Sequence, residues 1–363
     1  MHMRPRNFIV FSLLLLTTVA AAGTEDSSFV YGIFAAEPSC PLIQERLAQL
    51  PLRKTVLLSV EAGSGLVLDR PSGIKQLQCA VTVLQRGSHE VKALMLQDIS
   101  FLNNAEESVR RVREVAQLSP RAVHGIVVDI EPYVDESWGC GSLTQRRATA
   151  AQYIALLQAI RAAARPMKLE AVVPWWYSAM TDIPELQPAS LYSAADGLYA
   201  MLYGDPGGPV VDGSAQKVLD HVPRNSPFFK KGKFYVAVAT YEAQSAQHLD
   251  QEIAALRKQY KGVRGFAGVS VFRAGGPYAA PLVRSLLGSV IDLNGAGVPS
   301  ALVQFDTTKT ETNSCGHFGL RDMDKAEGDL IVSKPGFRTV SQPVQLAPPG
   351  RERDLPPIRL TPK

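Results

Sequence analysis

Two carboxylic acids end an apolar stretch of the chain, and they are the residues best suited to chemistry. The stretch is His124-Gly-Ile-Val-Val-Asp-Ile-Glu-Pro-Tyr133. In a β-strand successive side chains alternate between two faces, so Asp129 and Glu131 share one face while Ile126 and Val128 point the other way. Like-charge repulsion raises the carboxyl pKa towards neutrality in such a pair. A carboxyl group of this kind can deliver a proton at neutral pH.

Glycoside hydrolysis is one reaction that needs this property. Cleaving a glycosidic bond requires a proton on the leaving oxygen and stabilisation of the positive charge that develops on the sugar. We therefore expect Glu131 to act as general acid/base, with Asp129 as its orienting partner. The alternative is that both acids only cap loops or bind backbone N–H groups, because acid pairs also occur in structural networks. Sequence leaves both interpretations open.

The rest of the chain must place these acids at an accessible edge. Between residues 23 and 286, short apolar runs alternate with helical stretches such as 104–118, 144–164 and 246–260. This alternation predicts a parallel sheet, and eight units over about 250 residues predict an α/β fold, a (β/α)8 TIM barrel with catalytic groups at its C-terminal rim. An open doubly wound sheet is the alternative, although no Gly-rich loop follows the first run. The runs are 29–35, 55–60, 91–97, 123–130, 169–173, 197–202, 234–239 and 266–272.

Aromatic residues stand near the ends of these runs. Trp175 and Trp176 follow the fifth run directly, and Tyr133 follows the acid pair. Sugars present apolar C–H faces that stack on such rings, so these three residues are candidate substrate contacts. Either tryptophan could instead pack between the strands and a helix, since Trp is usually largely buried. Further candidates at run ends are Glu37, Glu61, Asp98, Tyr241, Glu242 and Arg273.

The acid-bearing run resembles the fourth-strand motif of family 18 glycoside hydrolases, the chitinase-like barrels. Asp129 and Glu131 match that motif, whereas Val127 and His124 stand where it has two further acids. The resemblance implies a secreted glycoside hydrolase-like protein in which the acetamido group of the substrate is the nucleophile and Asp129 orients it.

A second segment adds to this resemblance. Tyr199-Ala-Met-Leu-Tyr203 is similar to the Met-x-Tyr segment of the family, and the resemblance implies that Tyr203 hydrogen-bonds the acetamido group. Gly204 stands where an acid or Asn is usual, and Asp205 follows one residue later. We include Asp205 and Arg273 among the expected substrate-binding residues.

A non-catalytic role is the main alternative. Val127 and Gly204 remove charged or polar groups that the family pattern has. The chain would then be a carbohydrate-binding or envelope scaffold protein that retains the barrel. In both interpretations the expected partner is a polysaccharide or other glycan.

The C-terminal residues 287–363 have a different pattern. After a short helix expected at 278–286, alternating strands are predicted at 301–305, 317–320, 330–333, 339–346 and 358–360, which indicates a small antiparallel β-sandwich. This part resembles the carboxypeptidase regulatory-like (transthyretin-type) domain, which implies an accessory module without chemistry of its own. The matching residues are Asp292, Gly295, Val298, Pro299, Ala301, Val303, Gly316, Phe318, Gly336 and Phe337.

Residues 1–22 have the pattern of a secretory signal peptide. A charged start precedes the apolar stretch 8–19, and Ala20, Ala21 and Ala22 offer a small-residue cleavage site. We expect a secreted or periplasmic protein without a membrane span after cleavage. In such a compartment cysteines form disulfides or remain as thiols, and spacing does not select a pairing. The four cysteines are Cys40, Cys79, Cys140 and Cys315.

Other function classes find little support in the composition and motifs. The formal charge of +4 comes without a run of Lys or Arg, so no nucleic-acid partner is expected. The six histidines show no paired ligand spacing, and neither a metal site nor a cofactor is expected. A serine-hydrolase elbow and a phosphate-binding loop are also missing from the sequence. We expect a monomer.

Overall fold

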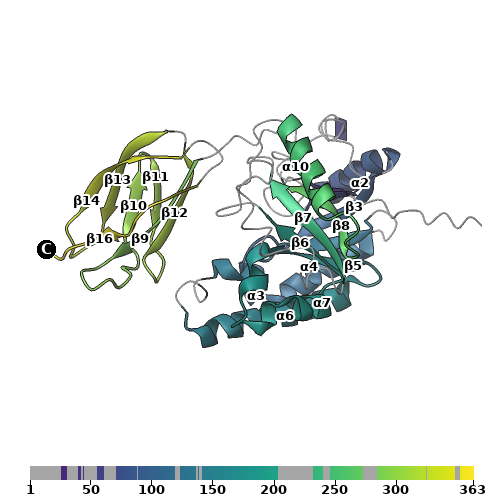
Figure 1. Ribbon diagram of the computed structural model, residues 1–363, viewed down its shortest axis with the longest axis horizontal. Helices are drawn as coiled ribbons and strands as arrows, with labels where there is room; N and C mark the ends of the chain where they lie inside the picture. Colours follow the sequence, from purple (N-terminus) through teal and green to yellow (C-terminus); the bar gives the residue numbers. More distant parts are fainter. Residues whose placement is uncertain are drawn as a thin grey trace, which may run out of the picture.

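The computed structural model describes two parts of the chain, an α/β part up to residue 272 and a β part from residue 284 (Figure 1). The described residues are 26–30, 40–41, 44, 55–60, 71–87, 89–118, 123–135, 138, 141–202, 232–239, 246–272, 284–323, 325–347 and 352–363. The expected signal peptide lies outside them. Among the helices described, none is long and apolar enough to cross a bilayer.

Eight parallel strands form the first part. Each strand pairs with the next along the chain, and β1 pairs with both β2 and β8, so the strand order closes on itself. The predicted mixed α/β class with a curled parallel sheet is confirmed. The strands are β1 (Ser27–Val30), β2 (Thr55–Ser59), β3 (Glu90–Met95), β4 (Gly125–Val128), β5 (Lys168–Pro174), β6 (Gly197–Met201), β7 (Lys233–Ala239) and β8 (Phe266–Phe272).

Helices follow five of these strands within the described residues. They are α2 (Pro71–Arg86), α3 (Ser100–Asn103), α4 (Ala105–Leu118), α6 (Leu143–Ala164), α7 (Pro188–Ala194) and α10 (Ala246–Gln259). Three short 3-10 helices are also present, namely η1 (Pro132–Val134), η2 (Trp175–Ala179) and η3 (Pro184–Leu186). Because the stretches after β1, β6 and β8 lie largely outside the described residues, the complete (β/α)8 barrel stays a prediction.

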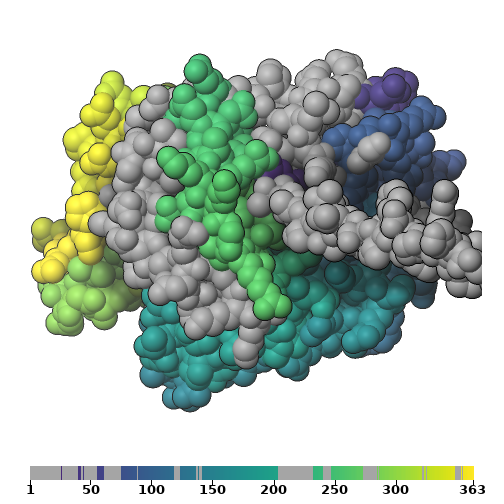
Figure 2. All heavy atoms as spheres, turned by 45° about the vertical axis from the view of Figure 1, so that its right-hand side comes forward, coloured from purple at the N-terminus to yellow at the C-terminus, as the bar shows by residue number. Residues whose placement is uncertain are grey.

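The helices form where local signals and amphipathic spacing agree. At the start of α6 the Ser142 hydroxyl accepts from the Gln145 N–H, while the Gln145 side chain accepts from the Ser142 N–H at 2.8 Å. This capping box satisfies two N–H groups that an isolated helix end leaves unpaired. In α10, Leu249 and Ile253 are buried and Arg257 is exposed, and Figure 2 shows the exposed face in green.

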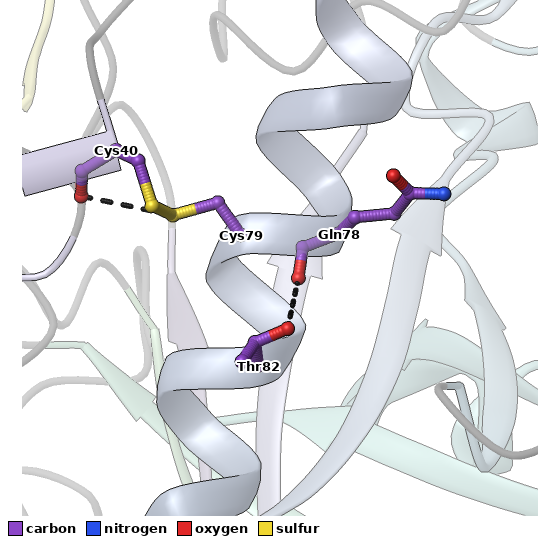
Figure 3. The surroundings of a disulfide bond; sticks show 4 residues. All are labelled: Cys40, Gln78, Cys79 and Thr82. Atoms are coloured by element: carbon purple, nitrogen blue, oxygen red, sulfur yellow. Dashed lines mark hydrogen bonds between the residues drawn. A yellow bond between two sulfur atoms is a disulfide. The ribbon is translucent and has the colours of Figure 1, made fainter.

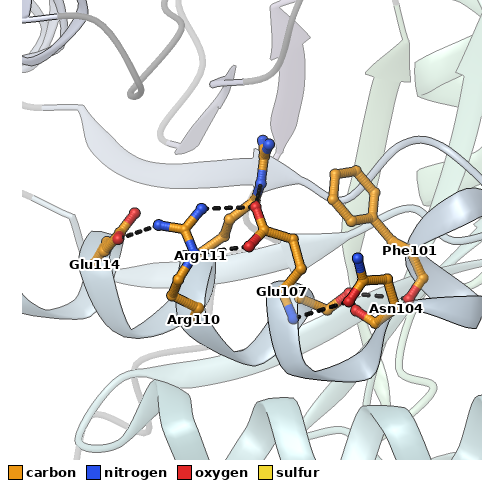
Figure 4. A network of polar contacts seen from close by, with 7 residues as sticks. Phe101, Asn104, Glu107, Arg110, Arg111 and Glu114 are labelled. Atoms are coloured by element: carbon orange, nitrogen blue, oxygen red, sulfur yellow. Dashed lines mark hydrogen bonds and ion pairs between the residues drawn. The ribbon is translucent and has the colours of Figure 1, made fainter.

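A charged network covers the exposed side of α4 (Figure 4). Glu107 accepts hydrogen bonds from Arg110 and Arg111, and these bonds lower the pKa of Glu107 to about 2. Arg110 also contacts Glu114, one turn further along the helix. Asn104, which the sequence predicts as the start of this helix, accepts from the Glu107 N–H at 3.3 Å. Such exposed pairs keep the outer face polar and contribute little to stability.

The interior of the strand ring has its own apolar core, separate from the core between strands and helices. Its members point inward from six different strands, so the ring is filled with side chains rather than open. They are Leu57, Leu94, Val127, Val172, Tyr199, Met201, Tyr235 and Ala237.

A buried ion pair lies inside the same ring. Lys92 Nζ is 2.7 Å from Glu170 Oε2, and the two side chains are only 5% and 3% exposed. The Tyr199 hydroxyl donates to the same carboxylate oxygen at 3.1 Å. Gly197 makes room for Glu170, since a Cβ at this position would lie only 3.2 Å from the Glu170 side chain. Each buried charge therefore has a partner, as burial in a low-dielectric interior requires.

The second part is a β-sandwich with one shared core. One sheet has the order β11 (Thr308–Glu311), β10 (Leu302–Phe305), β13 (Glu327–Ser333) and β14 (Val340–Gln345). The other contains β12 (His317–Met323), β9 (Arg284–Ile291), β15 (Glu352–Asp354) and β16 (Ile358–Arg359). Apolar residues of both sheets, including Val303 and Phe318, form a single cluster between them.

Two details of this part differ from the sequence prediction. The sandwich is not wholly antiparallel, because β15 and β16 pair in parallel with β9. The short helix expected at 278–286 is wrong over residues 284–286, which begin β9, since the apolar residues there pack into the sandwich core. The domain boundary at residue 287 remains a prediction, as does the relation to the transthyretin-type domain.

Three of the four cysteines are disulfide-bonded, and two of them pair with each other. Cys40 and Cys79 form a disulfide with a Cα–Cα distance of 5.9 Å, which ties Cys40 to helix α2 (Figure 3). Cys315 is also disulfide-bonded, and Cys140 lies outside the described residues. The alternative of free thiols is therefore wrong for Cys40, Cys79 and Cys315.

The buried ion pair gives a stability prediction. Replacing Lys92 by Met leaves the Glu170 carboxylate buried without its cation, so we expect the free energy of unfolding to fall by about 3–5 kcal/mol. The double variant K92M/E170L removes both charges and should recover most of this loss. Urea unfolding followed by circular dichroism measures both changes.

The exposed pair of Lys325 and Asp306 provides the matched control. The change K325M should alter stability by no more than about 1 kcal/mol, because solvent screens that pair. An equal loss in K92M and K325M would contradict the role given to the buried pair.

Candidate functional site

The two acids lie at the carboxyl end of β4, on its inner face. The Asp129 N–H donates to the Met95 carbonyl at 3.3 Å, so pairing with β3 continues past the last strand residue. Val127 belongs to the inner core, whereas Ile130 packs in the outer core against the helices. Alternation along the strand then puts Asp129 and Glu131 on the same side as Val127. The sheet thus presents both carboxyl groups towards the mouth of the strand ring.

Asp129 is half-buried, but one of its two carboxyl oxygens is unusual. Its Oδ1 atom is inaccessible to solvent and has no hydrogen-bond partner among the described residues. Burial, and to a smaller extent the charge of Glu131, raise the pKa of Asp129 well above its ordinary value. The protonated form of Asp129 is therefore favoured over a wide pH range.

Glu131 has a different environment, although it is only two residues away. It precedes η1, where Pro132 occupies the first helical position, and its side chain is half-buried. The Tyr133 hydroxyl donates to Glu131 Oε1 at 2.6 Å. A hydrogen bond donated to a carboxylate favours its charged form. This hydrogen bond favours the charged form of Glu131, whereas burial of the Asp129 carboxyl group favours its protonated form.

Aromatic rings surround the hydroxyl that binds Glu131. The ring of Tyr133 lies 5.1 Å from that of Trp176 and 6.4 Å from that of Tyr177, edge to face in both cases. Trp176 is half-buried, which leaves part of its ring at the surface beside the acids. Trp175, in contrast, is only 6% exposed and packs in the outer core. The packing alternative considered for a tryptophan describes Trp175, and Trp176 is the ring available to a ligand.

Two tyrosines that the sequence did not single out lie close to the acid pair. Tyr153 on α6 and Tyr177 on η2 are both 0% exposed, and neither hydroxyl has a hydrogen-bond partner among the described residues. Burial raises the pKa of both tyrosines, and the charges of Asp129 and Glu131 raise it further. Tyr177 completes the Trp-Trp-Tyr triplet, which was a usable signal. Tyr153 looks like any core residue on the apolar side of a helix.

The neighbouring end of β3 is shaped by an unusual backbone. Leu96 is fully buried and has a φ of 57°, in the left-handed region that residues other than glycine rarely adopt. It directly follows Met95, whose carbonyl accepts from Asp129. Backbone strain of this kind concentrates at functional sites. Next along the chain, the Gln97 side chain accepts from the Ser59 hydroxyl at 2.6 Å.

Several expected site residues are not part of this group. Tyr203, Asp205 and Arg273 lie outside the described residues, as do Glu37, Glu61, Tyr241 and Glu242. Asp98 has a local structural role, because its Oδ1 accepts from the Ser100 N–H at 2.7 Å at the start of α3. That interaction with Ser100 lowers the pKa of Asp98. Within the described residues, no group of three or more His, Cys, Asp or Glu side chains could hold a metal ion.

Comparisons with known proteins show a fold likeness only. No family model matches the chain, and no curated protein matches it. A family 18 chitinase from Pseudoalteromonas aurantia is 15% identical, with 69% of this chain and 94% of that chain covered and a TM-score of 0.45. The exo-β-1,4-mannosidase Op5Man5 from Opitutaceae bacterium strain TAV5 is 9% identical, with 69% and 51% covered and a TM-score of 0.47. The xylanase and alpha-amylase inhibitor protein from Scadoxus multiflorus is 14% identical, with 69% and 93% covered and a TM-score of 0.41.

At these scores the likeness carries no argument about activity, so the class of the protein comes from its own structure. The described strands and helices define a TIM-like α/β protein followed by a β-sandwich. Its candidate site is a pair of carboxyl groups at the end of the fourth parallel strand, bordered by a half-buried tryptophan.

The environment of Asp129 gives a prediction of stability against pH. Below the ordinary pKa of 3.8 the residue is protonated in both states and contributes nothing. Above it, the unfolded chain ionises while the folded protein retains the proton, so Asp129 increasingly destabilises the fold until its raised pKa is reached. The change D129N should therefore stabilise the protein at pH 7, and the gain should vanish as the pH falls to about 3.8, changing by at most about 1.4 kcal/mol per pH unit.

Urea unfolding between pH 3.5 and pH 7.5, in roughly half-unit steps, measures this gain. Asp329 on β13 is exposed, and D329N is the matched control without a pH-dependent gain. A D129N variant that is less stable than the natural protein at pH 7 would show that Asp129 is charged and stabilised in the fold.

Proposed function

We propose that this protein is a secreted glycoside hydrolase-like protein that cleaves a polysaccharide by general acid catalysis from Glu131. The observation that carries the proposal is the difference in environment between two neighbouring carboxyl groups. Both side chains are half-buried, but Asp129 Oδ1 is inaccessible to solvent and the pKa of Asp129 is raised, whereas Glu131 accepts from Tyr133 at 2.6 Å. Two acids whose environments differ in this way are the usual basis of acid–base catalysis.

The reaction follows from this arrangement. When a sugar displaces water from the mouth of the ring, the proton passes from Asp129 to Glu131, and Glu131 then donates it to the leaving oxygen of the glycosidic bond. The resemblance to family 18 glycoside hydrolases implies that an acetamido group of the sugar supplies the nucleophile. Asp129, now charged, would orient that group, and Tyr203 and Asp205 would contact it. Trp176 offers an apolar ring face to the sugar.

Several finer features belong to the same proposal. The α/β part would be a complete (β/α)8 barrel over residues 23–286, preceded by a signal peptide at 1–22. Residues 287–363 would be an accessory carboxypeptidase regulatory-like module. The Cys40–Cys79 disulfide supports an oxidising compartment outside the cytoplasm, because disulfides persist there.

A non-catalytic glycan-binding or envelope scaffold protein is the second candidate, and one observation favours it. Val127 stands where the family motif has an acid, and it is fully buried in the inner core with Leu94 and Val172. An apolar, packed side chain therefore occupies the position at which the family motif has a charged residue. In this case Trp176 and Tyr133 would bind sugar without bond cleavage.

Replacement of Glu131 separates the two candidates. We expect E131Q to lower the rate of reducing-end release by about 10²–10⁴-fold, since it removes the acid but keeps the shape. The assay uses chitin oligosaccharides first and β-mannan and xylan next, and sugar binding is measured in parallel by calorimetry. Binding to E131Q should stay within about threefold of the natural protein.

Glu114 on the exposed side of α4 provides the matched control. The change E114Q removes the same charge away from the site and should leave both turnover and binding unaltered. If the natural protein binds a glycan and releases no product, the binding candidate is correct. Equal turnover by E131Q and the natural protein would remove Glu131 from the mechanism.

A further inference from the structure

We propose that Tyr153 and Tyr177 are positioning residues that act through Asp129, as hydrogen-bond donors for the carboxylate that forms when Asp129 gives its proton to Glu131. The inference rests on the proposed function, because it assigns the groups that make the proton transfer possible. Neither tyrosine is needed to touch the sugar. Their role is to stabilise one charge state of a neighbouring acid.

Buried polar atoms without partners are the first argument. The Tyr153 hydroxyl, the Tyr177 hydroxyl and Asp129 Oδ1 are all inaccessible to solvent, and none has a hydrogen-bond partner among the described residues. Each such atom costs about 1–3 kcal/mol, so folded proteins contain few of them. Three such atoms near one acid pair depart from this general pattern, and departures of this kind are expected at functional sites.

Contacts between the elements bring these atoms into one neighbourhood. Helix α6, which carries Tyr153, contacts η1, the turn directly after Glu131. The ring of Tyr177 lies 6.4 Å from that of Tyr133, whose hydroxyl binds Glu131. The charges of Asp129 and Glu131 raise the pKa of both Tyr153 and Tyr177, which places the two hydroxyls within electrostatic reach of the acids.

Both rings are held in place by packing against other residues. Tyr177 is edge to face with Trp176 at 4.9 Å and tilted against Trp138 at 6.4 Å. Its carbonyl accepts from Gln187 Nε2 at 3.0 Å, which holds η2 in place. Tyr153 belongs to the buried face of α6 and to the outer core. Fixed rings can keep hydroxyl groups ready for a charge without the cost of ordering them.

The proton balance is simple. The O–H bond of Asp129 breaks and an O–H bond forms on Glu131, so the negative charge moves from Glu131 to Asp129 and no other reactant is needed. Burial keeps Tyr153 and Tyr177 protonated, which makes them donors rather than bases. The titratable groups within electrostatic reach of Asp129 are Glu131 from the turn after β4, Tyr153 from α6 and Tyr177 from η2, and the Tyr133 hydroxyl binds Glu131.

An infrared titration tests the assignment without any sugar. The C=O stretch of protonated Asp129 is the band that D129N lacks, and its loss on raising the pH gives the pKa of Asp129. Removing a donor destabilises the charged form, so Y153F and Y177F should each move the midpoint upward by about 1 pH unit. Since only an unpartnered hydroxyl is removed, neither change should lower stability in urea.

Tyr260, which follows α10, provides the matched control. It is also fully buried, it stacks on Phe266 at 5.2 Å, and burial alone raises its pKa. The change Y260F should leave the Asp129 midpoint where it is. Unchanged midpoints in both Y153F and Y177F would overturn the proposal.

Turnover data distinguish this inference from the proposed function. With both correct, Y153F and Y177F lower kcat by about tenfold and leave KM within about twofold, because the tyrosines act on the proton transfer and not on sugar binding. If E131Q loses turnover but the tyrosine variants leave the Asp129 midpoint unchanged, only the positioning role of the tyrosines is wrong. If the tyrosine variants shift the midpoint but the protein cleaves no glycan, the coupling to Asp129 is correct and the proposed hydrolase activity is wrong.

As a second measurement, the pH dependence of the D129N stability gain can be compared in the natural and Y153F backgrounds. The gain should go on rising to a higher pH in Y153F before it becomes constant, by the same interval as the shift of the infrared midpoint. A gain that becomes constant at the same pH in both backgrounds contradicts the proposal even if one variant folds less efficiently.

Discussion

The cost of burying charge inside a closed ring of strands is the constraint on which this structure depends. The ring interior is filled by apolar side chains, and two kinds of carboxyl group are present within it or at its mouth. Lys92 and Tyr199 contact the Glu170 carboxyl group directly. Asp129 has no such partner among the described residues, and burial therefore raises its pKa. One acid is neutralised by a cation and the other by a proton, and only the second arrangement leaves a proton to donate.

The different environments of Glu170 and Asp129 are also reflected in the side chains along β4. Three inward positions of β4 carry, in order, Gly125, Val127 and Asp129. The glycine lies beside the Lys92 side chain, and the valine belongs to the apolar inner core. The buried ion pair joins the two strands on either side of β4, β3 and β5, whereas Asp129 follows the last residue of β4.

Much of this arrangement could be predicted from sequence, since hydrophobic periodicity and local helix signals determine it. The strand bounds near 55–59, 233–239 and 266–272 follow apolar runs, and α4 and α6 begin next to Asn104 and Ser142 as capping predicts. The parallel pairing of β15 and β16 with β9 was missed because it joins short segments far apart in the chain. Inward placement of Asp129 and Glu131 follows from alternation alone. The residues near these acids cannot be predicted in this way. Tyr153, for example, lies on a helix, and its spacing there is that of any core residue.

The same reasoning bears on what Val127 means for function. A third acid at this position would point into the apolar core with Leu94 and Val172, one layer below Asp129, and would itself need a proton or a cation. Such an acid could take the proton of Asp129 and share its charge. With Val127 at this position, we assign the stabilisation of charged Asp129 to other donors. Among the described residues these are the hydroxyls of Tyr153 and Tyr177, which are buried and without hydrogen-bond partners.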